Sequence, residues 1–273
     1  MSKSAEKPSY AEPSLLRADK NGVATLTLNR PAQRNSLSES LMLSLTETLR
    51  EIANDSSVRC VVLAANGPMF CAGHDLKELT AARADADRGR VYYQKIMTIC
   101  STMMQTIVNL PKPVIARVHG IATAAGCQLV ASCDLAIAAE GTHFATPGVN
   151  IGLFCSTPMV ALSRNVSRKH AMEMLLTGDM IDAARAADMG LINMAVPVDN
   201  LDHAVTVLAE KLASKSSLTL AIGKQAFYQQ LEKPLSEAYD FASDVMVKNM
   251  MAHDAEEGID AFIEKRAPKW QDK

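Results

Sequence analysis

The chain lacks the residue patterns of several common functional classes. Its six cysteines form neither a Cys-x-x-Cys pair nor a cluster with histidine, which disfavours a metal site and favours a reducing compartment. The formal net charge is −2, without the basic excess of a protein that binds nucleic acid or a membrane surface. No stretch of about 18 apolar residues lacks charge, so we expect no insertion into a membrane.

The N-terminal residues lack a targeting signature as well. Residues 1–22 contain no apolar run of signal-peptide length, and Glu6, Glu12 and Asp19 are unusual for a mitochondrial-type presequence. We therefore expect residues 1–14 to be a flexible leader on a cytoplasmic protein. The alternative is a protein of the mitochondrial matrix whose presequence has been removed.

What the chain does contain is an alternation of strand and helix patterns. Apolar runs of strand type cover residues 22–31, 58–67, 112–120 and 134–141. Helical spacing lies between them, over residues 35–57, 91–108 and 124–133. This order indicates an α/β fold whose strands pair in parallel through right-handed crossovers. We expect the first helix to begin with a capping box formed by Ser36 and Glu39.

From Ser156 onward, helical spacing dominates. The stretches concerned are residues 167–178, 199–216, 218–231 and 236–266. The sequence therefore predicts a βα core over residues 15–200 and a helical C-terminal region over residues 201–273.

Two stretches rich in small residues connect predicted strands to helices. In residues 67–79, "GPMFCAGHDLKEL", Gly73 allows the backbone to approach a ligand closely. In residues 119–129, "HGIATAAGCQL", a helix opens near Ala124. Its free N–H groups would favour a developing negative charge. Tight packing between strand and helix would explain the small residues equally well.

Together, six stretches resemble the enoyl-CoA hydratase/isomerase (crotonase) superfamily in order and spacing over residues 15–270. They are "LNRP", "FCAGHDLKEL", "KPVIARVHGIATAAGCQLVASCDLAIAAE", "FATPGVNIG", "LTGDMIDAARAADMGLIN" and "EGIDAFIEKRAP". The likeness is greatest to mitochondrial enoyl-CoA hydratase domain-containing proteins and their bacterial relatives. It implies a crotonase-like spiral of ββα units with a helical C-terminal trimerisation region. It also implies a homotrimer or a dimer of trimers, with a coenzyme A thioester as substrate and no further cofactor.

The resemblance assigns roles to particular residues. The N–H groups of His74 and Ala125 would form an oxyanion hole for the thioester oxygen as it becomes an enolate. Losing one such donor typically costs about 2.7–4 kcal/mol of transition-state stabilisation. The His74 side chain would either line the pocket or act only as a spacer. Positions expected to contact CoA or substrate are Ala32, Gln33, Arg34, Ala72, Asp75, Leu76, Lys77, Leu79, Gly148 and Lys265.

Two of these CoA-binding assignments have a simpler alternative. Lys265 resembles a lysine that meets the nucleotide phosphate, often from a neighbouring subunit. Arg34 and Lys265 would otherwise be ordinary solvated surface charges, which is the commoner fate of such residues.

The sequence departs from the hydratases at the positions of their two catalytic glutamates, which hold Gln128 and Gly148. An amide can orient water but cannot exchange protons near neutral pH, and glycine has no side chain. General acid–base groups contribute roughly 10²–10⁴ in rate. We therefore expect hydration to be weak or absent. Where dienoyl-CoA isomerases of the superfamily add an aspartate, this chain has Ser156.

Other residues near these stretches could replace the missing carboxylates. They are His119, His143, Asn150, Cys155 and Ser156. Cys155 is chemically the most capable, although a buried cysteine is usually an inert apolar group. Cys155 and Ser156 thus join His74, Ala125 and Gln128 as catalytic candidates. Asp134 is expected to be a structural hydrogen-bond acceptor at the start of a buried strand.

Three functions fit this pattern. The first is an acyl-CoA-processing enzyme of fatty-acid or related acyl-CoA metabolism that acts through an enolate. The second is a decarboxylase of a malonyl-type CoA thioester, which needs the same hole but no base, because departure of CO₂ generates the charge. The third is an acyl-CoA-binding protein without catalysis.

Overall fold

A computed structural model describes residues 12–273 of the chain, so residues 1–11 of the expected leader lie outside the described part. Its larger sheet has the strand order β1-β2-β3-β4-β6-β9. These strands are Leu15–Lys20, Val23–Leu28, Cys60–Ala65, Val114–Val118, Leu135–Ala139 and Met194–Val196. A smaller sheet has the order β5-β7-β8. Its strands are Ile121–Thr123, His143–Ala145 and Ile181–Asp182.

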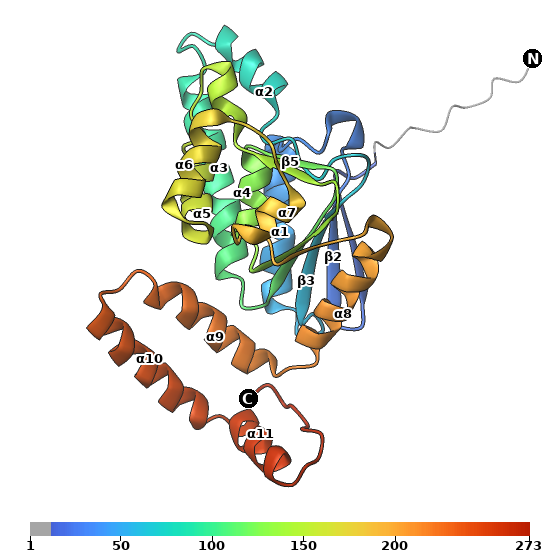
Figure 1. The fold of residues 1–273 in the computed structure, drawn as a ribbon, viewed down its shortest axis with the longest axis vertical. Coiled ribbons are helices and arrows are strands. Elements are labelled where there is room, and N and C mark those ends of the chain that lie inside the picture. Colours follow the sequence, from blue (N-terminus) through green and yellow to red (C-terminus); the bar gives the residue numbers. More distant parts are fainter. Residues whose placement is uncertain (1–11) are drawn as a thin grey trace, which may run out of the picture.

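Helices cover both faces of the larger sheet, and further helices extend from it (Figure 1). In the core they are α1 (Glu39–Asn54), α2 (Leu76–Ala81), α3 (Arg90–Asn109), α4 (Ala125–Ser132), α5 (Pro158–Asn165), α6 (Arg168–Thr177), α7 (Ala183–Asp188) and α8 (Leu201–Ala213). The C-terminal helices are α9 (Ser217–Gln230), α10 (Leu235–Met250) and α11 (His253–Ile263). The α/β class and the presence of a helical C-terminal region are as predicted. Helix α8, which was expected in that region, instead packs against the larger sheet.

The predicted parallel pairing is confirmed for the strands from β2 through β9 of the larger sheet. All six residues of β3 are buried, as its continuous apolar run predicts. Alternate residues face two separate clusters. Val61 and Leu63 join the main core, whereas Cys60 and Val62 pack with residues of α8. The antiparallel strand β1 at the sheet edge was not predicted.

The expected capping box at Ser36 is wrong. Helix α1 begins at Glu39, and its N-cap is Ser38, whose hydroxyl accepts the N–H of Leu41 at 3.3 Å. Ser36 instead donates its hydroxyl to the carboxylate of Asp75, 3.1 Å away. The Ser36 hydroxyl thus bonds to a residue 39 positions later in the chain, whereas the local pattern predicted that it caps α1.

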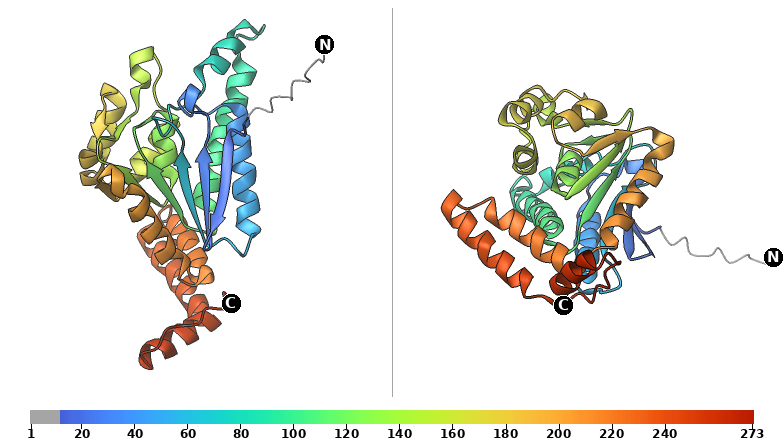
Figure 2. Two further views of the ribbon diagram at one scale, coloured as in Figure 1. Left: turned by 90° about the vertical axis from the view of Figure 1, so that its right-hand side faces the viewer. Right: turned by 60° about the horizontal axis from the view of Figure 1, so that its bottom comes forward.

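The stretch over residues 236–266 also differs from one continuous helix. It breaks at Met251 and Ala252 into α10 and α11. The hairpin of α9 and α10 stands away from the sheet (Figure 2). No helix within residues 12–273 combines the length and apolar composition needed to cross a bilayer.

A partly buried carboxylate, that of Asp134, attaches α9 to the core. Asp134 accepts hydrogen bonds from Lys224 at 2.7 Å, from the Tyr228 hydroxyl at 3.0 Å and from the Val114 N–H at 2.7 Å. The Lys224 side chain is only 8% exposed, so its charge is neutralised by this pair rather than by water. The expectation that Asp134 is a structural acceptor is confirmed.

The C-terminal residues fold back on the base of this helical region. Asp272 accepts hydrogen bonds from Arg59 and from the Ser217 N–H, each at 2.7 Å. Asp254, whose side chain is 0% exposed, accepts the N–H groups of Gln271 at 2.7 Å and Asp272 at 3.0 Å. Through residues 271 and 272, these bonds connect α11 to the start of α9 and to Arg59, which directly precedes β3.

The variant Asp254→Asn should be less stable at neutral pH and less sensitive to acid. Burial by itself would raise the pKa of Asp254, but hydrogen bonds from Ser216, Gln271 and Asp272 outweigh it and lower the pKa. A lowered folded-state pKa stabilises the fold above the unfolded value of about 3.9, and this stability disappears as the pH falls below it. Hydrogen bonds to a charged group contribute about 1.5–3 kcal/mol.

Urea unfolding of parent and variant at pH 7, 5, 4 and 3 measures this difference. We expect the gap in unfolding free energy to be largest at pH 7 and to narrow as the pH falls below about 4. A gap of constant size across this range would show that the Asp254 charge does not stabilise the C-terminal fold.

Candidate active site

The first small-residue loop is held against the second by backbone hydrogen bonds. After β3 ends, Cys71 pairs with Ala122 of β5 as an isolated parallel bridge. Its N–H donates to Ile121 O at 3.2 Å, and its carbonyl accepts the Thr123 N–H at 3.0 Å. The Thr123 hydroxyl also lies 3.2 Å from the carbonyl of Ala72. The loop therefore follows the approach to α4 closely.

The backbone of His74 is fixed from the opposite side. Leu37 donates its N–H to Gly73 O at 2.8 Å and accepts the Asp75 N–H at 3.2 Å, which makes His74 its partner in a parallel bridge. In such a bridge the central residue directs its own N–H away from the partner, because successive peptide groups point to opposite sides of a strand. The His74 N–H is therefore directed away from Leu37.

Gly73 brings this loop into contact with α4. A Cβ atom at Gly73 would lie 2.9 Å from Ala124 Cβ and 3.2 Å from Ala125 N, and the φ angle of Gly73 is +89°. Gly126 is equally close on the other side, since a Cβ there would lie 2.2 Å from Cys71 O. Both glycines are required by the close approach of the two backbones, which places the His74 and Ala125 peptides side by side.

Ala125 is the first residue of α4, and the preceding Ala124 provides no side-chain cap. Neither Ala125 nor His74 donates its N–H to any group in residues 12–273. Ala124 has φ 50° and ψ −121°, a conformation that costs a non-glycine residue about 1–3 kcal/mol. Its N–H bonds to Ala145 O at 2.9 Å. The structure thus brings together the two predicted donors, and the dipole of α4 adds to their attraction for an anion.

Gln128 follows Ala125 by three residues and so lies on the same side of α4. It is 5% exposed, and its Oε1 atom is buried without a hydrogen-bond partner among the described residues. The Nε2 atom of His74 is also buried without a partner, and burial lowers the pKa of this imidazole. The Gln128 side chain is therefore a neutral amide, and the His74 side chain a neutral imidazole.

At position 148, where the resemblance predicts the second glutamate of a hydratase, neighbouring atoms occupy the space beside the backbone. Gly148 belongs to a 3₁₀ turn, Pro147–Ile151, and a Cβ atom on it would lie 2.8 Å from Leu153 O and 3.0 Å from Cys155 Sγ. Burial raises the pKa of the Cys155 thiol, so the sulfur stays protonated and neutral near pH 7. Ser156 is exposed, with its hydroxyl 3.4 Å from Phe154 O.

Three further candidates were His119, His143 and Asn150, and both histidines contact backbone carbonyls. His119 Nε2 lies 2.7 Å from Gly67 O, and His143 Nδ1 lies 2.9 Å from Gly141 O. Asn150 is exposed. These contacts do not involve the His74 or Ala125 N–H groups. A catalytic use of either histidine stays a prediction.

Most of the expected CoA positions lie in or beside the loop of residues 67–79, called the oxyanion loop below after its expected role. Ala32, Gln33 and Arg34 are exposed around a short 3₁₀ turn. The Ala72 N–H donates to Arg34 O at 3.1 Å, which joins this segment to the first loop. Lys265 is different, because it follows α11, at the opposite end of the molecule from α2 (Figure 1). The structure does not bring Lys265 to the other positions within one chain.

The remaining positions of this set surround the start of α2. Asp75 is its N-cap, and the Lys77 N–H donates to Asp75 Oδ1 at 3.0 Å. Leu76 and Lys77 are exposed, and Leu79 is half-buried. Leu76 and Lys77, two and three residues after His74, are therefore accessible to a ligand that approaches from this side.

Two residues that support the site were not singled out from the sequence. Arg30 forms an ion pair with Asp75 at 3.0 Å. Asn35 is 0% exposed with φ 52°, and its side-chain amide donates to Asn66 O and Met69 O, each at 2.8 Å. The only local signal was that both lie in or just after "LNRP". Their partners are 30 or more residues away in the chain.

The chain resembles known proteins over nearly its whole length. The sequence pattern of the "Enoyl-CoA hydratase/isomerase" family matches residues 18–273. "Enoyl-CoA hydratase domain-containing protein 3, mitochondrial" of Rattus norvegicus is 48% identical over 250 residues, covering 92% of this chain and 82% of the relative. A crystal structure described as enoyl-CoA hydratase of Mycobacterium smegmatis is 52% identical with a TM-score of 0.90, covering 95% of this chain and 99% of that chain.

The crystal structure of human enoyl Coenzyme A hydratase domain-containing protein 3 is 44% identical, again with a TM-score of 0.90. It covers 94% of this chain and 100% of that chain. The chain is therefore an acyl-CoA-processing member of the enoyl-CoA hydratase/isomerase family, with the crotonase fold.

Proposed function

We propose that the site binds an acyl-CoA thioester and stabilises its enolate through the His74 and Ala125 N–H groups, while hydration of an enoyl group stays slow. The carrying observation is the pair of backbone N–H groups that form no hydrogen bond within residues 12–273 and flank the close contact at Gly73. Fixed donors of this kind stabilise a developing oxyanion without having to reorganise during the reaction.

Slow hydration is inferred from the side chains that surround these donors. Hydration requires a group that takes a proton from water and a group that returns one to carbon, and general acid–base catalysis contributes roughly 10²–10⁴ in rate. Gln128 offers only an amide, and the backbone around Gly148 leaves no room for a side chain. The protonated thiol of Cys155 supports neither role.

Decarboxylation of a malonyl-type CoA thioester is the second candidate function. The observation that favours it is the absence of charge at Gln128 and on the His74 imidazole. A glutamate at position 128 would repel the carboxylate of such a substrate, whereas an amide can donate a hydrogen bond to it. Breaking the bond to CO₂ leaves its electron pair on the enolate held by the two N–H groups, so no base is needed for this step. The enolate is then protonated at carbon by solvent water, which releases the acyl-CoA product.

Assays on one preparation separate the possibilities. Hydration of crotonoyl-CoA is followed by loss of the enoyl absorbance, and CO₂ release is measured with malonyl-CoA and methylmalonyl-CoA. Calorimetry measures the affinity for butyryl-CoA. Slow hydration with CO₂ release supports the second candidate, and tight binding without any turnover indicates an acyl-CoA-binding protein. Rapid hydration by the parent would contradict the proposal.

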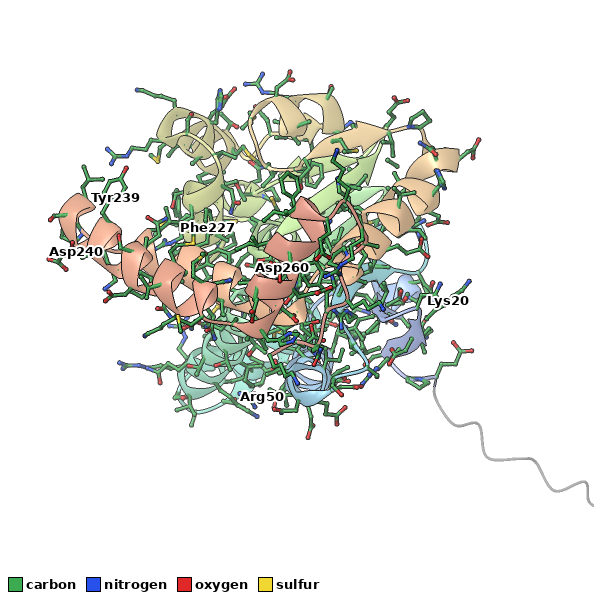
Figure 3. All side chains as sticks on the ribbon, turned by 90° about the horizontal axis from the view of Figure 1, so that it is seen from below. Lys20, Arg50, Phe227, Tyr239, Asp240 and Asp260 are labelled. Carbon is green, nitrogen blue, oxygen red and sulfur yellow. The ribbon has the colours of Figure 1, made fainter. Side chains whose placement is uncertain are left out.

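We further propose that the chain assembles into a homotrimer or a dimer of trimers through its C-terminal helices. The α9–α11 region exposes many large apolar side chains, and Figure 3 shows Phe227 and Tyr239 among them. Phe227 is 57%, Tyr239 70% and Phe262 85% exposed. Soluble monomers rarely expose so much contiguous apolar surface.

The double variant Phe227→Asp/Tyr239→Asp should therefore be smaller than the parent in solution, because charge opposes burial of these side chains in an interface. Light scattering coupled to size-exclusion chromatography measures the mass. Asp240→Asn, next to Tyr239 on α10, is the control and should leave the mass unchanged. A monomeric parent at micromolar concentration would contradict the assembly.

The compartment stays a proposal as well. The rat relative is named as mitochondrial, which supports the alternative that this chain also acts in the matrix, whereas its acidic N-terminal residues favour the cytoplasm. The six cysteines are buried and free, and both compartments are reducing.

A further inference from the structure

A buried ion pair connects the two segments that build the site. Arg30 Nη2 lies 3.0 Å from Asp75 Oδ2, and the side chains are only 19% and 10% exposed. The Ser36 hydroxyl donates to the same Oδ2 atom at 3.1 Å, and Arg30 Nη1 donates to the Ser36 carbonyl. These hydrogen bonds link Arg30, Ser36 and Asp75 into one network, which restricts the movement of its members.

The hydrogen bonds of Asp75 fix the backbone next to the His74 peptide. Asp75 follows His74 directly, its N–H donates to Leu37 O at 3.2 Å, and its Oδ1 atom caps α2 through the Lys77 N–H at 3.0 Å. Burial by itself would raise the pKa of this carboxyl, but hydrogen bonds from Arg30, Lys77 and Ser36 lower it. The carboxylate thus stays charged and holds the residue next to the donor in place.

The Arg30 end controls the segment expected to meet CoA. Its backbone N–H donates to Asn35 Oδ1 at 2.8 Å, and its carbonyl accepts the N–H groups of Gln33 at 3.0 Å and Asn35 at 2.9 Å. The backbone of Arg30 therefore shapes the turn over residues 31–34, while its guanidinium reaches the oxyanion loop. One residue belongs to both parts of the site.

We propose that Arg30 and Asp75 are positioning residues that hold the His74 N–H in place for the thioester oxygen and couple the CoA segment to the oxyanion hole. This inference rests on the proposed function, because it requires that His74 is a donor to the substrate. A donor displaced by about 1 Å can cost roughly 10²-fold in rate, so a loosened Asp75 should weaken the hole without removing it.

The enolate absorbance of bound acetoacetyl-CoA distinguishes positioning of the donor from a general contribution to stability. Its enolate absorbs in the near ultraviolet, so a site that stabilises the oxyanion increases this absorbance on binding. CoA without an acyl group reports only on the CoA segment. For Asp75→Asn we expect the affinity for the enolate form to fall by about tenfold or more, and the affinity for CoA without an acyl group to fall by a smaller factor.

The chain contains a matched control for this substitution. Asp55 also accepts an arginine side chain, Arg17 at 2.9 Å, and the backbone N–H two residues ahead, Ser57 at 3.0 Å. It lies at the end of α1, away from the oxyanion loop. Asp55→Asn removes the same kind of charge from the same kind of turn, and we expect no change in either affinity.

Two milder variants keep the test decisive if Asp75→Asn folds poorly. Ser36→Ala removes one hydrogen bond from Asp75, and Arg30→Lys keeps the charge but loses the planar fork. Both should reduce the enolate absorbance by an intermediate amount. An unchanged absorbance, or equal losses for CoA and acetoacetyl-CoA, would overturn the positioning role. If the parent itself shows no enolate absorbance, the proposed function fails, and this inference fails with it.

Discussion

Gly73→Ala is expected to reduce enolate stabilisation by roughly 10²–10³-fold, the cost of losing one oxyanion donor. The new Cβ atom would lie 2.9 Å from Ala124 Cβ, 3.1 Å from Thr123 O and 3.2 Å from Ala125 N. All three atoms belong to the approach to α4, so the two loops must separate and the two donors can no longer reach the same oxygen. Titration with acetoacetyl-CoA, followed by enolate absorbance, measures the loss.

Gly141→Ala separates steric displacement from backbone strain. Gly141 has a φ of +83°, close to the +89° of Gly73, but a Cβ atom there would meet nothing within 4 Å. Both variants carry a comparable conformational penalty, which destabilises the fold by about 1–3 kcal/mol. Only Gly73→Ala should weaken the enolate absorbance. Similar losses in both would mean that general destabilisation, not displacement of the donors, explains the effect.

Gln128→Glu is expected to increase crotonoyl-CoA hydration by roughly 10²-fold, because it supplies a general acid–base group at a buried position. Glutamate has nearly the shape of glutamine, and Gln128 Oε1 has no hydrogen-bond partner that the substitution would break. A carboxyl that is 5% exposed should have a raised pKa, which favours proton exchange near neutral pH. The rate is measured from the loss of enoyl absorbance.

Gly148→Glu tests the other glutamate position and should not increase the rate. Its Cβ atom would lie 2.8 Å from Leu153 O and 3.0 Å from Cys155 Sγ, so the turn must move before any carboxylate can reach the substrate. If neither variant exceeds the parent, a missing proton-transfer group is not what limits hydration. If Gly148→Glu alone restores it, the turn is far more adaptable than its contacts indicate.

Local sequence patterns were sufficient to predict features set by neighbouring residues in the chain, such as a buried strand or a tight turn. The continuous apolar run of β3 indicated a strand buried on both faces, and the small residues around Gly73 and Ala125 indicated a close backbone approach. Asp134 was predicted as a structural acceptor from its place before a buried strand, although its partners Lys224 and Tyr228 come from a helix some 90 residues later.

The remaining features depend on contacts between distant segments. The Ser36 hydroxyl had two possible partners, and only the tertiary structure shows that Asp75 takes it rather than the helix. The Arg30–Asp75 pair spans 45 residues, which no periodicity detects. At Gly148 the sequence revealed a missing glutamate, but not that Leu153 and Cys155 occupy its space.

The most direct test of the account is the absorbance of acetoacetyl-CoA in the presence of excess parent protein near pH 7. If the His74 and Ala125 N–H groups form a working oxyanion hole, the enolate band should increase on binding and should be lost in Gly73→Ala. If acetoacetyl-CoA binds no more tightly than CoA and shows no such band, these two N–H groups do not stabilise an enolate.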